Sequence, residues 1–331
     1  MMLTLTKRPY GGETDLEAIA NLLEACEAVD KLEQWTTVSE LERDFNSPYF
    51  DKERDLQLWE DDTGQLIGFA TLWHPSVGEL TDVRLGFRVH PQTRGGTLER
   101  EIINWGEQRL AELAKEQGVT SVKLRCNSRD DQIDRIAILH ENGFSADRYF
   151  LTMVRSLQEP LAEPQIPTGF TVRSVIAEQD AEAWVEMHNQ SFIDHWNHHD
   201  LTVEEYKHWR TDPDYRPELD LVAIAPDGTF ASHCYCAIYP EDNKRSGRIE
   251  GWVAILGTRR GFRRLGLGKA MLLSGMQKLL AAGMDIAKIG VDYDNPNGAR
   301  QLYESVGFRK LYTWVWYCKD VRAGLVNNPF I

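Results

Sequence analysis

Hydrophobic and polar positions follow the same order twice along this chain. Segments with a period of two predict strands, and segments with a period near 3.6 predict helices. Each half predicts the order β-α-α-β-β-β-α-β-α-β. This order indicates an α/β (α+β) fold, with a mixed, mostly antiparallel sheet flanked by helices. The corresponding segments are 3–6 and 171–174, 56–73 and 219–239, 81–89 and 248–256, 98–117 and 267–282, 121–126 and 287–291, and 149–154 and 311–317.

Turn residues carry the same repeat. Gly64 and Gly228 each stand in a short turn that joins two strand-like segments, which predicts two hairpins. Gly143 and Gly307 each follow a helical segment, where glycine is a common helix terminator. The two members of each pair are equally far apart in the sequence, and a repeat this regular is hard to obtain by chance.

The length of the chain and its proline distribution place the domain boundary. A chain of 331 residues is long enough for two domains, and 42% hydrophobic residues are sufficient for two buried cores. Residues 156–169 contain three prolines and predict a linker. We therefore expect a first domain at residues 1–155, a linker at 156–168 and a second domain at 169–331.

The composition of the chain indicates which cellular compartment and which classes of binding partner to expect. A net charge of −14 argues against a nucleic-acid partner. The sequence contains no run of about 18 apolar residues, so we expect no membrane-spanning segment. The N-terminal segment lacks the apolar core of a signal peptide. Five cysteines, an odd number, suit reduced thiols, and Cys234 and Cys236 are expected to be buried on one strand face. We expect a cytoplasmic monomer or homodimer without nucleic-acid or membrane partners.

The chemistry is concentrated in residues 259–271, where four arginines precede two glycines and an apolar helix. Backbone N–H groups at a helix N-terminus and guanidinium groups both bind phosphate. A dinucleotide-binding loop would need a glycine where Met271 stands, and the spacing of a nucleotide P-loop from Gly261 also fails. The pattern that remains is Arg-x-x-Gly-x-Gly, from Arg263 to Gly268, between a predicted strand and a predicted helix.

With its surroundings, this loop resembles that of the GNAT acyltransferase superfamily. The resemblance rests on the loop, on the strand at 287–295 and on the segment 295–308, in which Asn295 and Pro296 are expected to open the last helix. Through the repeat it extends over both halves, as two tandem GNAT-like domains similar to those of mycothiol synthases. In the superfamily the loop binds the pyrophosphate of acetyl-CoA, the next strand diverges to admit the pantetheine arm, and a tyrosine lies near the thioester.

The resemblance implies the site residues. Tyr303 is the implied catalytic acid, and Glu250, at the start of the strand before the loop, is the implied base; an aromatic anchor and a strand-end charge are the alternatives. Asp194, His195 and Trp196 are expected to contact the acceptor or to pack at the domain seam. Acetyl-CoA is the co-substrate, and no metal is expected. The implied acetyl-CoA contacts are Leu256, Gly257, Thr258, Arg263, Arg264, Leu265, Gly266, Leu267, Gly268, Lys269, Asn295 and Tyr303.

The first copy of the loop departs from the pattern. Thr97 and Glu99 stand where the second copy has its two glycines. Thr97 adds a Cβ where the backbone would have to approach the pyrophosphate closely, and Glu99 adds a negative charge that would repel it. His140 stands in place of Tyr303. We expect the first domain to be degenerate, although Arg94 and the two glycines that follow it leave a looser CoA site as the alternative.

These observations predict a cytosolic N-acetyltransferase that transfers an acetyl group from acetyl-CoA to the amine of a small molecule, with its active site in the second domain. The alternatives are a non-catalytic protein that binds or senses acyl-CoA, and an O-acyltransferase. The sequence does not identify the acceptor, because one superfamily can host many.

Overall fold

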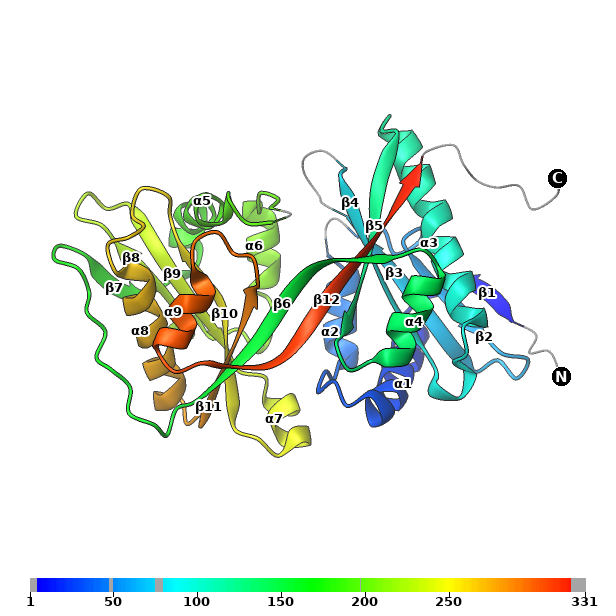
Figure 1. The fold of residues 1–331 in the computed structure, drawn as a ribbon, viewed down its shortest axis with the longest axis horizontal. Coiled ribbons are helices and arrows are strands. Elements are labelled where there is room, and N and C mark those ends of the chain that lie inside the picture. Colours follow the sequence, from blue (N-terminus) through cyan, green and yellow to red (C-terminus); the bar gives the residue numbers. More distant parts are fainter. Residues whose placement is uncertain (1–4, 48–49, 75–79, 197, 323–331) are drawn as a thin grey trace. The chain divides into compact units, whose positions relative to one another are not determined.

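The computed structural model describes residues 5–47, 50–74, 80–196 and 198–322, and the chain divides into two compact units. The first unit comprises the described residues up to Arg148 together with those from Trp314 onward. The second unit comprises Tyr149–Thr313. Each unit consists of one sheet with helices packed on both of its faces (Figure 1).

The first unit has a mixed sheet in which β4 and β5 are parallel and the other described strand pairs are antiparallel. In spatial order its strands are β1 (Thr6–Pro9), β2 (Leu56–Glu60), β3 (Leu66–Trp73), β4 (Asp82–Val89), β5 (Ser121–Arg129) and the second part of β12 (Arg309–Arg322). Its helices are α1 (Glu13–Asp30), α2 (Val38–Phe45), α3 (Thr97–Glu116) and α4 (Ile133–Glu141).

The second unit repeats this arrangement, with β10 and β11 as its parallel pair. In spatial order its strands are β6 (Ser145–Ser156), β11 (Ile286–Asp292), β10 (Glu250–Thr258), β9 (Phe230–Ala237), β8 (Asp220–Ile224) and β7 (Thr171–Ser174). Its helices are α5 (Ala181–Phe192), α6 (Val203–Trp209), α7 (Pro240–Ser246), α8 (Leu267–Ala281) and α9 (Ala299–Ser305). The predicted fold class and element order are confirmed; α7 is an additional helix that the periodicity did not predict.

Strand β9 shows why this sheet carries helices on both faces. Its side chains alternate, so that Cys234 and Cys236 face α8 while His233 faces α5. A Cβ on Gly275 of α8 would lie 2.5 Å from the sulfur of Cys234, so only glycine lets the helix approach this closely. Both thiols are buried, as predicted, and act as small apolar side chains in the core.

The closing strand of each unit comes from the other half of the sequence. Strand β6 pairs with β11, from Phe150 opposite Asp292 to Ser156 opposite Ile286. Strand β12 pairs with β5, from Trp314 opposite Arg129 to Arg322 opposite Ser121. The repeat is therefore present in the order of the elements, but the compact units do not divide at residues 155 and 169.

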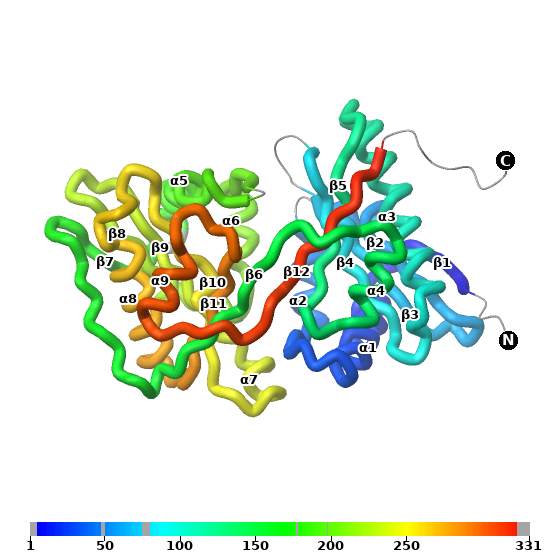
Figure 2. The backbone as a smooth tube through the Cα atoms, viewed as in Figure 1, coloured from blue at the N-terminus to red at the C-terminus, as the bar shows by residue number. Residues whose placement is uncertain are grey.

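Two irregularities of the second unit make room beside its sheet. The pairing of β10 with β11 ends at Val253 opposite Ile289, and the register of β10 against β9 shifts between Val253 and Ile255. A bulge of this kind bends its strand, so β10 and β11 diverge beyond it. In Figure 2 the backbone can be followed from β10 through α8 and β11 into α9.

The last helix of this unit begins later than the sequence predicted. Asn295 and Pro296 were expected to open it, but α9 begins at Ala299 after Gly298, whose φ is 77°. The Asn295 side chain accepts from the backbone N–H of Asn297 at 2.9 Å and so forms a separate turn. The left-handed Gly298 ends that turn, and the helix follows. None of the described helices combines the length and the hydropathy of a membrane-spanning segment.

Candidate active site

A cavity of about 570 Å³ lies in the second unit where β10 and β11 diverge. The loop between β10 and α8 closes one end, the turn before α9 forms a wall, and the end of α5 forms the opposite wall. The predicted cofactor residues that line the cavity are Leu256, Gly257, Thr258, Arg263, Arg264, Gly266, Gly268, Lys269, Asn295 and Tyr303. Leu265 is exposed and Leu267 is buried in the core under α8, so neither side chain lines the cavity.

The loop presents unpaired backbone donors to this cavity. Within the described part of the chain, the backbone N–H groups of residues 263–269 have no hydrogen-bond acceptor. The loop alternates between negative and positive φ, with values of 98° at Gly261, 65° at Arg264 and 88° at Gly266. Such alternation turns successive N–H groups toward one concave side, and the N-terminus of α8 adds positive potential there. The loop therefore presents the donors and the positive potential that an anion-binding site needs.

Neither the packing around Gly268 nor its backbone conformation requires a glycine at this position. A Cβ at this position would lie 3.6 Å from Leu302 Cδ2 and 3.6 Å from Thr258 Oγ1, which are ordinary contacts. The backbone there is helical, so alanine would also be conformationally acceptable. The space beside Gly268 thus belongs to the cavity, and a ligand that approaches the backbone accounts for the missing side chain.

The Arg263 guanidinium is occupied by the protein itself. It donates to the Thr258 carbonyl at 3.1 Å, to the Ser191 carbonyl at 2.9 Å and to Asp194 at 2.6 Å. It also reaches the Asn297 side chain at 3.2 Å. Arg263 therefore ties together the end of β10, the end of α5 and the turn before α9. Among the described residues, Arg264 and Lys269 have no carboxylate partner and are the cations that a phosphate could use.

Tyr303 lies on α9 with its side chain buried against the cavity. Helix α9 directs it toward the diverging strands, and Phe308 packs beside its ring at 6.2 Å between centroids. Burial raises the pKa of the phenol above its usual range. The hydroxyl has no hydrogen-bond partner among the described residues, so it keeps its proton and is available to a ligand.

Glu250 lies outside the residues that line the cavity. It stands at the first position of β10, before the bulge, and its carboxylate pairs with Lys288 of β11 and with Arg248 at 3.0 Å. Asn243 of α7 further holds its backbone carbonyl at 2.8 Å. The structure thus brings Tyr303 to the cavity and leaves Glu250 in an ion-pair cluster at the other end of the strand.

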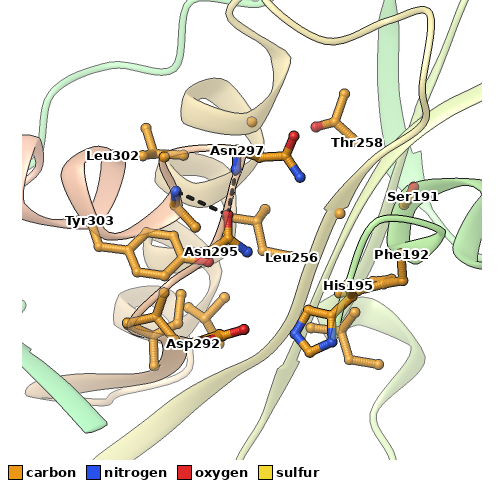
Figure 3. A pocket seen from close by; sticks show the side chains of 18 of the residues that line it. Ser191, Phe192, His195, Leu256, Thr258, Asp292, Asn295, Asn297, Leu302 and Tyr303 are labelled. Carbon is orange, nitrogen blue, oxygen red and sulfur yellow. Dashed lines mark hydrogen bonds between the residues drawn. The ribbon is translucent and has the colours of Figure 1, made fainter. Parts of the chain in front are cut away.

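His195 is the only one of the three predicted acceptor residues that lines the cavity within the described ranges. Asp194 instead pairs with Arg260 and Arg263, and the Trp196 ring packs 5.8 Å from Phe150. The His195 Nδ1 atom lies 2.9 Å from the backbone carbonyl of Trp196. A carbonyl can only accept, so this contact places the proton on Nδ1 and leaves Nε2 as a proton acceptor. In Figure 3, His195 and Tyr303 approach the cavity from opposite sides.

Two further histidines form a contact that the sequence analysis missed. His188 of α5 lines the cavity, and its Nδ1 atom lies 3.3 Å from Nε2 of His233 on β9. Burial lowers the pKa of His188 to about 4 and holds that of His233 well below its usual value. A Cβ on Gly257 would lie 2.5 Å from the His233 ring, which explains that glycine. The available signal was a histidine inside an otherwise apolar strand.

The first unit shows how its copy of the loop differs. The Glu99 carboxylate accepts from the backbone N–H of Gly96 at 2.8 Å and from that of Gly95 at 3.4 Å. It therefore occupies the donors that a phosphate would use. His140 does not take the place of Tyr303: the N–H of Phe144 bonds to Leu139, as the N–H of Phe308 bonds to Tyr303. The separation of 164 residues between Gly143 and Gly307 likewise sets Leu139 opposite Tyr303, so pairing His140 with the tyrosine was wrong by one position and leucine stands in its place.

Metal ligands do not gather in the described parts of the chain, where no group of three or more His, Cys, Asp or Glu side chains could hold an ion. The three histidines at 195, 198 and 199 do not converge: His195 faces the cavity, and His198 pairs with Asp200 at 3.0 Å.

Comparison with known proteins agrees with this geometry. Residues 181–308 match the model of the acetyltransferase (GNAT) family. The chain is 29% identical over 305 residues to the mycothiol acetyltransferase of Thermobispora bispora, covering 92% of this chain and 95% of the relative. It is 28% identical over 265 residues to the mycothiol acetyltransferase of Frankia casuarinae, covering 78% of this chain and 71% of the relative.

Solved structures share the complete two-unit fold. A GCN5-related N-acetyltransferase from Sphaerobacter thermophilus matches with a TM-score of 0.73 and 22% identity over 96% of both chains. A tandem GNAT protein from the clavulanic acid biosynthesis pathway matches with a TM-score of 0.70 and 13% identity, covering 98% of this chain and 99% of its own. At these identities the likeness concerns the fold.

Proposed function

Because the chain carries a domain of the GNAT acetyltransferase family and is an acetyl-CoA-dependent acetyltransferase, we propose that its second unit transfers the acetyl group to the amine of a small molecule. The observation that carries the proposal is the run of unpaired N–H groups at residues 263–269 beside a cavity that also holds Tyr303 and His195. The relatives are named for mycothiol, a small molecule, which supports an acceptor of that size.

The residues around the cavity fit acetyl-CoA as a substrate. The backbone of residues 264–268, with Arg264 and Lys269, would hold the pyrophosphate, since no protein group competes for these donors. The diverging strands offer Val253, Leu256 and Gly290 as walls for an extended arm. Bound there, acetyl-CoA supplies an activated acyl group as a thioester. Arg263 contributes by fixing the loop between its neighbours.

Tyr303 is the proposed catalytic acid. Its hydroxyl has no partner among the described residues and stays protonated because burial raises its pKa. A neutral phenol stabilises a departing thiolate by donating a hydrogen bond, and it can pass on the proton as negative charge accumulates on sulfur. The raised pKa makes complete proton transfer less favourable, so hydrogen bonding to the sulfur is the larger part of this role.

His195 is the proposed base for the attacking amine. Its Nδ1 proton is held by the Trp196 carbonyl, so Nε2 is the atom free to accept a proton. His188 is less suitable. If His188 Nδ1 donated to His233 Nε2, His233 would carry its own proton on Nδ1, which is buried and has no acceptor in the described part of the chain. The favourable arrangement is the reverse, in which His233 Nε2 donates to His188 Nδ1. His188 then carries its proton on Nε2 and has no free nitrogen to accept another. Glu250 is the remaining alternative, acting at a distance through water, but two cations already share its carboxylate.

The test uses purified full-length protein, acetyl-CoA and a panel of small primary amines and alcohols. Thiol release measures turnover, and mass spectrometry with hydroxylamine treatment separates a stable amide from a labile ester. We expect amides to form. Saturable acetyl-CoA binding without turnover on any acceptor would favour the non-catalytic alternative, and products cleaved by hydroxylamine would favour O-acylation.

Two variants assign the roles of the side chains. Tyr303→Phe should lower kcat by about 10- to 100-fold and leave acetyl-CoA binding nearly unchanged. His195→Ala should lower kcat, and imidazole added to the buffer should restore part of it, because a free base can replace a missing one. His198→Ala is the matched control, since its side chain pairs with Asp200 outside the cavity. A His195→Ala variant with normal kcat would exclude the proposed base.

A further inference from the structure

The first unit has its own cavity at the corresponding place in the fold. It measures about 640 Å³ and lies between the end of β4, the loop before α3, the start of α4 and the end of α1. The cavity of the second unit is bounded in the same way by β10, the loop before α8, and α9. The degenerate loop thus did not close this space, and its lining shows what it can hold.

A pyrophosphate has no place in the loop beside this cavity. The Glu99 carboxylate accepts from the N–H groups of Gly95 and Gly96, as described above. Arg94 is equally occupied: its two terminal nitrogens bind the two oxygens of Asp30 at 2.6 and 2.8 Å, and its Nε atom donates to the Val89 carbonyl at 3.1 Å. The backbone N–H groups of Gly95 and Gly96 and the Arg94 guanidinium therefore already have hydrogen-bond acceptors within the first unit.

Two other arginines have entered the cavity, at positions that are small in the second unit. Arg94 donates to Val89 as Arg263 donates to Thr258, so the residues before these acceptors, Arg88 and Gly257, correspond. Leu139 corresponds to Tyr303, so the residues four positions earlier, Arg135 and Ala299, also correspond. Gly257 and Ala299 line the cavity of the second unit, and Arg88 and Arg135 line that of the first.

Neither of these arginines has a carboxylate partner among the described residues. Arg88 donates to the Phe87 carbonyl at 3.1 Å, and Arg135 donates to the Asn127 carbonyl at 3.1 Å. The Arg135 guanidinium also stacks over the Phe87 ring at 4.1 Å from its centroid. These contacts fix the two side chains and leave further N–H groups of each guanidinium without an acceptor in the described ranges of the chain. Burial lowers the pKa of both, to about 10 for Arg135, as expected for cations without a counter-ion.

The carboxylates around the cavity do not neutralise this pair. Asp30 and Glu99 are bound as described, and Asp131 pairs with Arg129 at 2.7 Å. Asp134 and Glu141 are the remaining acidic residues of the lining, and both lie on the exposed part of α4. The interior therefore carries the positive charge of two arginines, and the negative charge is either paired or at the exposed surface.

We propose that the first unit binds a small carboxylic acid with an apolar body, its carboxylate held by Arg88 and Arg135. A guanidinium matches a carboxylate in shape and charge, and two of them beside one cavity favour an anion. The apolar part of the lining, which includes Phe87 and Ile138, suits a hydrocarbon body and gives no partner to a strongly hydrated ion such as free phosphate. This site is separate from the acetyl-CoA site of the second unit and does not depend on the acceptor proposed there.

The test measures binding of hexanoate to the full-length protein by calorimetry and by ligand-observed NMR, with hexanamide as the uncharged analogue. We expect saturable binding of hexanoate and at least tenfold weaker binding of hexanamide, because the amide lacks the charge. This comparison needs no variant. Equal affinities for the two compounds, or no saturable binding of hexanoate, would overturn the proposal. Phosphate binding as tightly as hexanoate would assign the site to inorganic anions instead.

Variants locate the site. Arg88→Gln and Arg135→Gln should each weaken hexanoate binding about tenfold or more. Arg54→Gln is the matched control: it removes the same charge from the same unit, but its side chain pairs with Glu116 outside the cavity. Thermal melting verifies folding, and Arg135→Lys, which keeps the charge, is the milder replacement if Arg135→Gln unfolds. Unchanged binding in the folded variants, or displacement of hexanoate by acetyl-CoA at this site, would refute the assignment.

Discussion

Alanine at Gly268 should have opposite effects on the stability of the protein and on its affinity for acetyl-CoA. The new Cβ would meet only ordinary contacts, at 3.6 Å from Leu302 and Thr258. Gly268 is the second residue of α8, where alanine is the better helix former. We expect the free energy of unfolding to rise by about 0.5 kcal/mol, less than the full Gly-to-Ala difference of a helix interior because the position is in the first turn. That corresponds to about 1–2 °C in Tm for a unit of this size.

The same Cβ should weaken acetyl-CoA binding strongly. A phosphate oxygen must come within about 2.9 Å of a backbone nitrogen to accept its hydrogen bond, and the added methyl group would stand in that approach. Loss of one or two charge-assisted hydrogen bonds costs about 1.5–3 kcal/mol each, so the Kd should rise at least tenfold. Calorimetry with acetyl-CoA and a thermal melt without it measure the two effects separately.

Gly275 of the same helix is the matched control. A Cβ there would lie 2.5 Å from the sulfur of Cys234 and 3.0 Å from that of Cys236, deep in the core. Gly275→Ala should lower the free energy of unfolding by about 1–3 kcal/mol and leave acetyl-CoA affinity of the folded protein unchanged. If Gly268→Ala binds acetyl-CoA as tightly as the natural protein, the backbone of α8 is not where the pyrophosphate is bound, and the reasoning fails.

Three further variants test other parts of the site. Arg263→Gln should lower the free energy of unfolding by about 2 kcal/mol in denaturant titrations and raise the KM for acetyl-CoA; a weaker salt dependence of that KM would show instead that the guanidinium contacts phosphate. Glu250→Gln should cost about 3 kcal/mol in the same titration because it removes the carboxylate charge that pairs with the buried Lys288 ammonium, and a loss of kcat in the folded variant would restore the glutamate as base. Burial raises the pKa of Asp220 to about 7, so the folded state binds the extra proton and stability falls as pH rises from about 4 to 7. Burial lowers the pKa of His188 to about 4, which makes stability rise from about pH 4 to 6.5. Asp220→Asn should therefore expose the rising slope, about 1.4 kcal/mol per pH unit or more, and a flat profile in equilibrium unfolding from pH 4 to 7 would contradict this.

Local patterns predicted the elements well, because strands and helices of this fold are amphipathic over their whole length. Strand β7 and helix α8 begin at the predicted residues, Thr171 and Leu267. The start of α9 was placed too early because Asn295 and Pro296 are equally suitable for a turn, and only the left-handed Gly298 that follows decides between the two. The short helix α7 has no buried face, so it gives no periodic signal.

The sequence prediction named residues that line the cavity where one continuous segment forms the wall. The loop from Arg263 to Lys269 is such a segment, and it lines the cavity nearly as expected. The contacts made by its side chains depend on distant residues, so the sequence could not show that Asp194 occupies Arg263. Likewise, the pairing of His188 with His233 joins a helix to a strand 45 residues later, and no local pattern reports it.

The exchange of closing strands has a consequence for how the protein is made. The first unit receives its closing strand from residues 314–322, which are synthesised after the second unit. At 5–20 residues per second, the interval between residue 156 and that strand is on the order of 10 s, during which β5 presents an unpaired edge. Emergence from the ribosome therefore sets the earliest time at which the first unit can be completed. A chain terminated in the linker would leave the first unit without its last strand, and would leave β6 without β11, the strand with which it pairs.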